Sequence, residues 1–147
     1  MPITLANGET CQCCELVAGR LPSVSEVRRN ALTITCVIPR QHEVGHLIVF
    51  PVRHVSTLME LTDEETAAIA TETRAMAGAL ERAYPEVGGF LIYQNNGTAS
   101  FQEVPHVHMH VVPRREGSGW PRMRFGWSQP AVPERAALIA RLIEARP

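Results

Sequence analysis

Apolar and β-branched residues gather in two short runs in the first third of the chain, and each run is followed by a proline. Residues 31–38 (ALTITCVI) and 45–50 (GHLIVF) have the composition of strands, and Pro39 and Pro51 mark their ends. Six residues lie between the runs, which is enough to turn the chain back on itself. We therefore expect the two strands to pair antiparallel.

A long helix is predicted after the second strand. Thr62 and Glu65 form a capping box, in which the threonine hydroxyl and the glutamate carboxylate each satisfy a backbone N–H at the start of the helix. Apolar residues at helical spacing then extend to about Ala83, and Pro85 follows. The apolar stripe consists of Ile69, Met76 and Leu80.

Two further strands are expected in the second half of the chain. They cover residues 89–94 and 104–112, and the first of them is followed by Asn95-Asn96-Gly97, a sequence typical of turns. The order strand, strand, helix, strand, strand predicts an α+β fold class with a mainly antiparallel sheet and a long flanking helix.

The two ends of the chain differ from this middle part. The first thirty residues mix glycine, proline and polar residues, which indicates a loop with a short helix near residues 14–19. Residues 114–133 are rich in arginine and chain-breaking residues, and residues 134–145 have the spacing of a short helix. We expect one folded domain over residues 1–113, with a C-terminal arm and short helix, 114–147, packed on the same domain.

Composition excludes several classes of protein. The net charge is −1, which argues against nucleic acid as a partner bound through a large basic surface. The chain also lacks the roughly 18 consecutive apolar residues of a membrane helix, so no membrane partner is expected. Residues 1–9 have neither the basic nor the apolar region of a secretory signal, and we expect a cytoplasmic location.

Three cysteines lie within four positions near the amino terminus. Adjacent cysteines fit disulfide geometry poorly, whereas the Cys11-x-x-Cys14 spacing is typical of metal-binding or redox-active pairs. The remaining residue, Cys13, is interpreted as a small packed side chain or a free thiol.

Three histidines alternate along the last predicted strand. Because side chains on a strand alternate between its faces, His106, His108 and His110 are expected on one face, opposite apolar neighbours. Such a row fits two kinds of chemistry. It can form a metal cage, or it can supply a nucleophilic histidine whose neighbours orient it and handle protons. The strand alone does not decide between them.

Motifs around this strand resemble those of the histidine-triad (HIT) superfamily, in particular its zinc-containing bacterial Hint-like branch. The motifs are Cys11-x-x-Cys14 followed by Glu-Leu-Val-Ala-Gly19, Gly45-His46, Pro51-x-x-His54, Asn95-Asn96-Gly97, Gln102 and His106-x-His108-x-His110-Val-Val-Pro-Arg114. The resemblance spans roughly residues 11–114. It implies a HIT-like fold with a twisted antiparallel sheet, flanking helices and assembly as a homodimer.

The resemblance also implies roles for the site residues. His108 would attack the α-phosphorus of a nucleotide-type substrate to form a nucleotidyl-histidine intermediate, and His110 would orient it. His46 matches the family's fourth active-site histidine. Asn95 and Gln102 match positions whose amides contact phosphate, where hydrogen-bond donors stabilise developing charge.

A structural zinc site is implied by four other matching positions, namely Cys11, Cys14, His54 and His106. Two thiolates and two imidazoles form a tetrahedral set that zinc prefers. His42 matches no ligand position and is expected at the surface.

The function that the resemblance implies is hydrolysis or nucleotidyl transfer at a phosphoramidate, an adenylyl conjugate or a dinucleoside polyphosphate. The chain departs from the nucleotide-binding pattern at Ile38, where those members carry an Asp or Asn that holds the ribose hydroxyls. Two alternatives remain open: a HIT-fold nucleotide-binding or regulatory module with little turnover, and removal of adenylate from nucleic-acid ends. The second would use the C-terminal arm for phosphate contacts and stacking, through Arg114, Arg115, Trp120, Arg122, Arg124 and Trp127.

Overall fold

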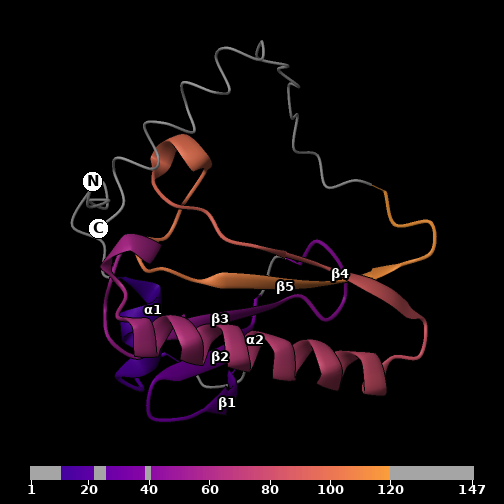
Figure 1. Cartoon of the computed structure of the whole chain (residues 1–147), viewed down its shortest axis with the longest axis horizontal. Coiled ribbons are helices and arrows are strands. Elements are labelled where there is room, and N and C mark those ends of the chain that lie inside the picture. The colour runs from indigo at the N-terminus through magenta and orange to yellow at the C-terminus, as the bar shows by residue number, and fades with distance from the viewer. Residues whose placement is uncertain (1–10, 22–25, 39–40, 120–147) are drawn as a thin grey trace.

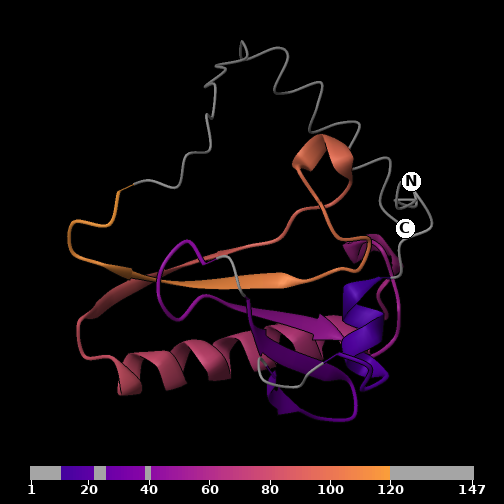
Figure 2. The same ribbon diagram turned by 180° about the vertical axis from the view of Figure 1, so that it is seen from behind.

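The computed structural model describes residues 11–21, 26–38 and 41–119 (Figures 1 and 2). Within these residues the elements in chain order are α1 (Gln12–Val17), β1 (Glu26–Arg29), β2 (Thr33–Val37), β3 (Leu47–Pro51), the 3-10 turn η3 (Leu58–Glu60), α2 (Asp63–Ala83), β4 (Val87–Tyr93), the 3-10 turn η4 (Thr98–Ser100) and β5 (Met109–Arg115). The strands form one sheet in the order β1-β2-β3-β5-β4, and every neighbouring pair is antiparallel. No helix among the described residues is long and apolar enough to cross a membrane.

The predicted α+β class and antiparallel sheet are confirmed. Strands β2 and β3 pair as expected, and β4 forms where residues 89–94 were predicted. Helix α2 begins after Thr62, whose hydroxyl accepts a hydrogen bond from the Glu65 N–H, and the reciprocal half of the capping box is also present. Strand β1 was missed and read as loop, because its sequence Glu-Val-Arg-Arg has no apolar alternation and its residues are mostly exposed at the sheet edge.

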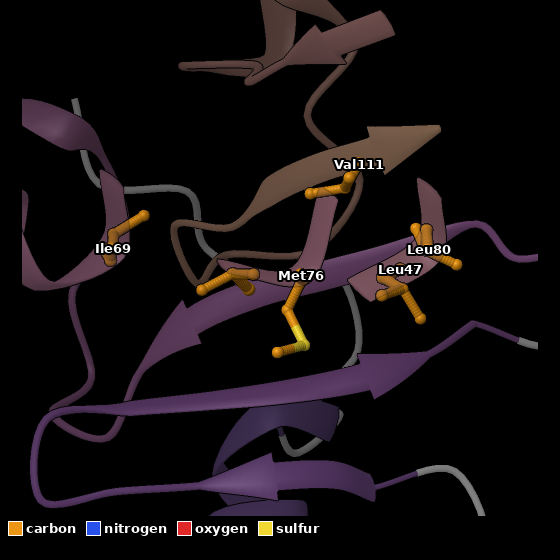
Figure 3. Close-up of a cluster of buried hydrophobic side chains, with 6 residues drawn as sticks. Leu47, Ile69, Met76, Leu80 and Val111 are labelled. Carbon is orange, nitrogen blue, oxygen red and sulfur yellow. The ribbon is translucent and has the colours of Figure 1, made fainter. Parts of the chain in front are cut away.

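The two helices cover opposite faces of the sheet. Helix α2 lies in front of the sheet in Figure 1, whereas α1 lies in front when the molecule is seen from behind (Figure 2). The α2 side holds a buried apolar cluster, part of which is labelled in Figure 3: Leu47, Val49, Ile69, Met76, Leu80 and Val111. The predicted helical stripe is therefore confirmed as the side of α2 that packs on the sheet.

The prediction that one strand carries all three triad histidines is wrong. Strand β5 begins at Met109, so only His110 lies in it. The register pairs Val49 with Met109, and its continuation would bring Val107 opposite Pro51. Because proline has no N–H to donate, the ladder stops there, and the Val107 N–H bonds instead to the Val55 carbonyl at 2.8 Å.

The carboxyl-terminal end of β5 also extends further than predicted, to Arg115 rather than Val112. The predicted short helix over residues 134–145 and most of the arm lie outside the described residues, so the division of the chain at residue 113 stays a prediction.

Candidate functional site

The cysteines and two histidines of the predicted metal site come together at one end of the sheet. The Nδ1 atom of His106 lies 3.6 Å from Cys11 Sγ and 3.7 Å from Cys14 Sγ, and the Nδ1 atom of His54 lies 3.1 Å from Cys14 Sγ. All four donor atoms lie within 4.8 Å of one another. Around a tetrahedral zinc ion, sulfur and nitrogen ligands would be separated by about 3.5 Å. The donor set and its spacing therefore fit such a metal.

Hydrogen bonding prepares His106 as a ligand. Its ring is fully buried, and its Nε2 atom lies 2.9 Å from the carbonyl oxygen of Pro51. Since a carbonyl only accepts hydrogen bonds, Nε2 carries the proton and Nδ1 presents its lone pair to the cysteines. The same Pro51 carbonyl thus orients a ligand at the position where the sheet ladder ends.

The buried side chain of Cys13 anchors the six-residue helix α1 and so fixes the positions of Cys11 and Cys14. Its side chain is buried with Ile34, Cys36 and Phe50 on the α1 side of the sheet. This anchors α1 and leaves Cys11 and Cys14, on either side of Cys13 in the sequence, near the histidines. The interpretation of Cys13 as a packed side chain agrees with this burial.

His108 is oriented by the backbone of its own segment. Its Nδ1 atom lies 2.7 Å from the carbonyl oxygen of His106, so Nδ1 is protonated and donates. Burial lowers the pKa of His108 below its ordinary value, which favours the neutral ring. In that neutral tautomer the lone pair lies on Nε2, which is then available as a nucleophile.

His46 and His110 are joined by a hydrogen bond between their rings. The His42 N–H donates to His46 Nδ1 at 3.3 Å, so the proton of neutral His46 lies on Nε2, which is 2.9 Å from His110 Nδ1. Burial is the main reason why the pKa of His46 falls to about 4 and the pKa of His110 to about 3. Both rings are therefore neutral near pH 7, and the proton of His110 is on Nε2.

Gly45 places His46 at this position. Its φ is +96°, a region that residues with a side chain rarely adopt, and a Cβ there would lie 3.2 Å from Leu80 Cδ2 and 3.2 Å from Pro113 Cγ. The Gly45-His46 pair of the motif is thus explained by a tight approach to α2 and β5. His42, predicted as surface, is exposed, yet its ring stacks on His46 with centroids 5.2 Å apart.

Gln102 and Asn95 differ in whether their amide protons are already bound within the protein. Gln102 is buried, and its Nε2 donates to the carbonyls of Ser56 and Val104, while its Oε1 accepts from the Gly97 N–H. Both amide protons are used within the protein, so in this arrangement Gln102 holds the loop before the histidines rather than offering a donor to phosphate. Among the described residues, the Asn95 side chain makes one hydrogen bond, from Nδ2 to the Phe101 carbonyl at 3.3 Å, and its second amide N–H has no partner there.

Tyr93 lies against the triad histidine His110 and was not predicted as a site residue. The Tyr93 ring stacks on His110 with centroids 4.3 Å apart and an angle of 13° between the planes. Tyrosine is common in strands, so its residue type gives no signal, and only its register opposite His110 distinguishes it. His108 also touches His110, at 4.7 Å between centroids, whereas His106 belongs to the Cys/His cluster.

Comparison with known proteins identifies the family. The model of the HIT domain matches residues 33–117. The adenosine 5'-monophosphoramidase of Schizosaccharomyces pombe is 30% identical over 142 residues, which cover 93% of this chain and 98% of that protein.

Solved structures agree with this match. A HIT-family protein from Bacillus subtilis superposes with a TM-score of 0.80 at 29% identity, covering 95% of this chain and 98% of that one. A zinc-bound histidine triad family protein from Mycobacterium smegmatis gives 0.71 at 31% identity, covering 93% and 98%. The chain belongs to the HIT domain family.

Proposed function

We propose that the protein is a hydrolase or nucleotidyl transferase that acts on a phosphoramidate, an adenylyl conjugate or a dinucleoside polyphosphate through His108. The observation that carries this proposal is the hydrogen bond from His108 Nδ1–H to the His106 carbonyl, which leaves the Nε2 lone pair free. A similar protein, from Schizosaccharomyces pombe, is named as an adenosine 5'-monophosphoramidase, which supports a nucleotide-type substrate.

The first chemical step is attack of His108 Nε2 on the α-phosphorus. A P–N bond to the histidine forms, and the bond from phosphorus to the leaving group breaks, with its electron pair going to that group. A leaving amine takes up a proton from solvent as it departs. The imidazole ring acquires positive charge as it attacks. Because the His106 carbonyl oxygen lies 2.7 Å from Nδ1, its dipole stabilises this charge without rearrangement.

In the second step, water attacks phosphorus and loses a proton to solvent, and the P–N bond breaks with its electron pair returning to His108 Nε2. The nucleotide is released and His108 is neutral again. Another acceptor in place of water makes the reaction a transfer. His110, held by His46, orients the nucleophile from the side, and Asn95 offers its second amide proton to a phosphate oxygen.

The wild-type protein should release AMP from adenosine phosphoramidate, and this is the experiment that tests the proposal. Brief incubation followed by acid-free digestion and mass spectrometry should find one adenylyl group on the peptide that contains His108. If no adenylylated substrate of the three classes is turned over, the proposed function is wrong.

We propose that the Cys/His cluster holds zinc, with Cys11, Cys14, His54 and His106 as its four ligands. Bound there, zinc would supply a fixed tetrahedral link between α1 and the segment that leads to the nucleophile. Its role is structural, since no described ligand position is left open for water. The backbone carbonyl of His106 would be held in place through this link.

Ile38 is proposed to limit recognition of the ribose. The residue directly follows β2, and its N–H lies 3.4 Å from the His46 carbonyl, next to the histidine pair. Its side chain cannot accept a hydrogen bond from a ribose hydroxyl. Ile38→Asp should therefore raise the preference for adenosine over 2'-deoxyadenosine phosphoramidate by about tenfold in kcat/KM, because a carboxylate accepts such bonds.

Ile38→Leu serves as the matched control for this prediction and should leave the ratio of the two substrates unchanged. An unchanged ratio in Ile38→Asp, with the fold intact by circular dichroism, would show that this position does not contact the sugar.

We further propose that the protein is a homodimer that pairs through β4. This strand is at the edge of the sheet, and Ile92 on it is 46% exposed. Exposed apolar edge strands tend to pair with another strand, and a twofold dimer satisfies both copies at once. Ile92→Lys should shift the mass measured by light scattering from twice 16.3 kDa toward the monomer.

The opposite edge of the sheet offers a matched control. Val27 on β1 is 51% exposed, so Val27→Lys introduces the same charge at a similar apolar site and should leave the dimer intact. A monomeric wild-type protein, or a dimer disrupted only by Val27→Lys, would contradict the proposed interface.

A further inference from the structure

We propose that Tyr93 is a positioning residue whose ring clamps His110 in the plane and tautomer that the reaction needs. This inference rests on the proposed function, since it concerns the same site. It adds a residue other than the three triad histidines and His46. It assigns the positioning role to the face of the Tyr93 ring rather than to its hydroxyl.

The sheet register brings the two rings together. Tyr93 is the last residue of β4 and lies directly opposite His110 of β5, which in turn pairs with Ile48 of β3 on its other side. Residues directly opposite on adjacent strands place their side chains on the same face in contact. His110 is therefore flanked by Ile48 and Tyr93 within the sheet.

The contact made by Tyr93 differs in kind from those made by the histidines. The planes of Tyr93 and His110 are only 13° apart, so one ring face covers the other. His46 and His108 meet His110 at 52° and 70°, with longer centroid distances of 5.1 and 4.7 Å. Among these described rings only Tyr93 lies nearly parallel to His110 and covers its face, while His46 contacts the ring through one nitrogen.

This restriction matters because His110 has a single hydrogen bond among the described residues that defines its ring orientation. The bond joins His46 Nε2 to His110 Nδ1 at 2.9 Å. If the ring rotates about its Cβ–Cγ bond, the bond is lost and the proton is no longer confined to Nε2. A stacked aromatic neighbour stabilises the bound orientation and covers that face of the half-buried His110 ring.

Three variants of the zinc-loaded full chain test the inference. Tyr93→Leu removes the stacked ring but keeps an apolar side chain, and Tyr93→Phe keeps the ring but removes the hydroxyl, for which no partner is found among the described residues. Leu91→Val, two residues earlier on β4 and opposite Val112, is the matched control on the same face.

Tyr93→Leu should lower kcat for AMP release roughly tenfold with KM within about twofold of wild type. In ¹⁵N NMR spectra of the imidazoles, its His110 signals should shift toward a mixture of tautomers. Tyr93→Phe and Leu91→Val should match wild type in kcat and in the His110 signals.

Unchanged kcat and unchanged His110 signals in Tyr93→Leu would overturn the inference. An equal loss of kcat in Tyr93→Phe would also overturn it, because the hydroxyl rather than the ring would then be responsible. A change in KM alone would overturn it too, because the ring would then be a substrate contact. If the wild type releases no AMP, the proposed function fails, but the NMR comparison still decides whether Tyr93 holds His110.

Discussion

Replacing His108 with alanine should reduce AMP release from adenosine phosphoramidate by roughly four orders of magnitude. Of His46, His106, His108 and His110, only His108 has a lone pair, on Nε2, that no hydrogen bond or cysteine engages among the described residues. Without it, no covalent intermediate forms, and the remaining groups stabilise charge around a reaction that lacks its nucleophile. The measurement is steady-state release of AMP with purified variant and wild type.

Two controls distinguish loss of the nucleophile from loss of the folded structure in His108→Ala. Zinc content and thermal stability should stay close to wild type, since the His108 side chain hydrogen-bonds to the backbone carbonyl of His106 and not to its ring or to a cysteine. Added imidazole should restore part of the activity by occupying the vacated space. Activity of His108→Ala near the wild-type level would refute nucleophilic catalysis by this residue, and loss of zinc in the variant would show that the triad is a metal cage.

Cys14→Ser should remove zinc and destabilise the protein. Cys14 Sγ contacts both histidine ligands, at 3.1 Å to His54 and 3.7 Å to His106, so its loss opens the tetrahedral set. We expect metal content to fall from near one zinc per chain to near none and the free energy of unfolding to drop by at least ~2 kcal/mol. The measurements are elemental analysis and denaturant unfolding.

Activity of Cys14→Ser should fall by about tenfold, far less than that of His108→Ala, because the metal acts on the nucleophile only through the position of the His106 backbone. Cys13→Ala is the matched control within the same turn of helix. It removes a buried side chain from the core but no ligand, so it should keep its zinc while losing some stability. Zinc retained by Cys14→Ser, or lost equally by Cys13→Ala, would contradict the ligand assignment.

Local sequence was sufficient to predict most of the fold. The capping box at Thr62 and the stripe ending at Leu80 define α2, since helix ends and helix faces are set by residues three or four positions apart. The strands β2 and β3 follow from β-branched runs bounded by proline. Strand β1 could not be predicted in the same way, because an exposed edge strand has no apolar alternation to mark it.

Most residues of the candidate site could also be predicted from spacing and resemblance, but not Tyr93, and not which histidines lie with the cysteines. The pattern His106-x-His108-x-His110 indicated one shared face. In the structure the ladder ends where Pro51 would have to donate, so His106 turns to the cysteines and His110 alone stays in the strand.

The sequence by itself determined most of the elements, the residue types of the metal site and of the histidine triad, and the family to which the chain belongs. Only the tertiary structure decided which ring nitrogen carries the proton in His46, His106, His108 and His110. It also decided that Gln102 binds carbonyls of its own loop and that Tyr93 covers His110. The physical reason is that these features depend on carbonyl groups and strand partners distant in the chain, such as Pro51 for His106 and Tyr93 for His110. A pattern of residues records which groups are present, whereas proton positions follow from the acceptors that folding brings beside them.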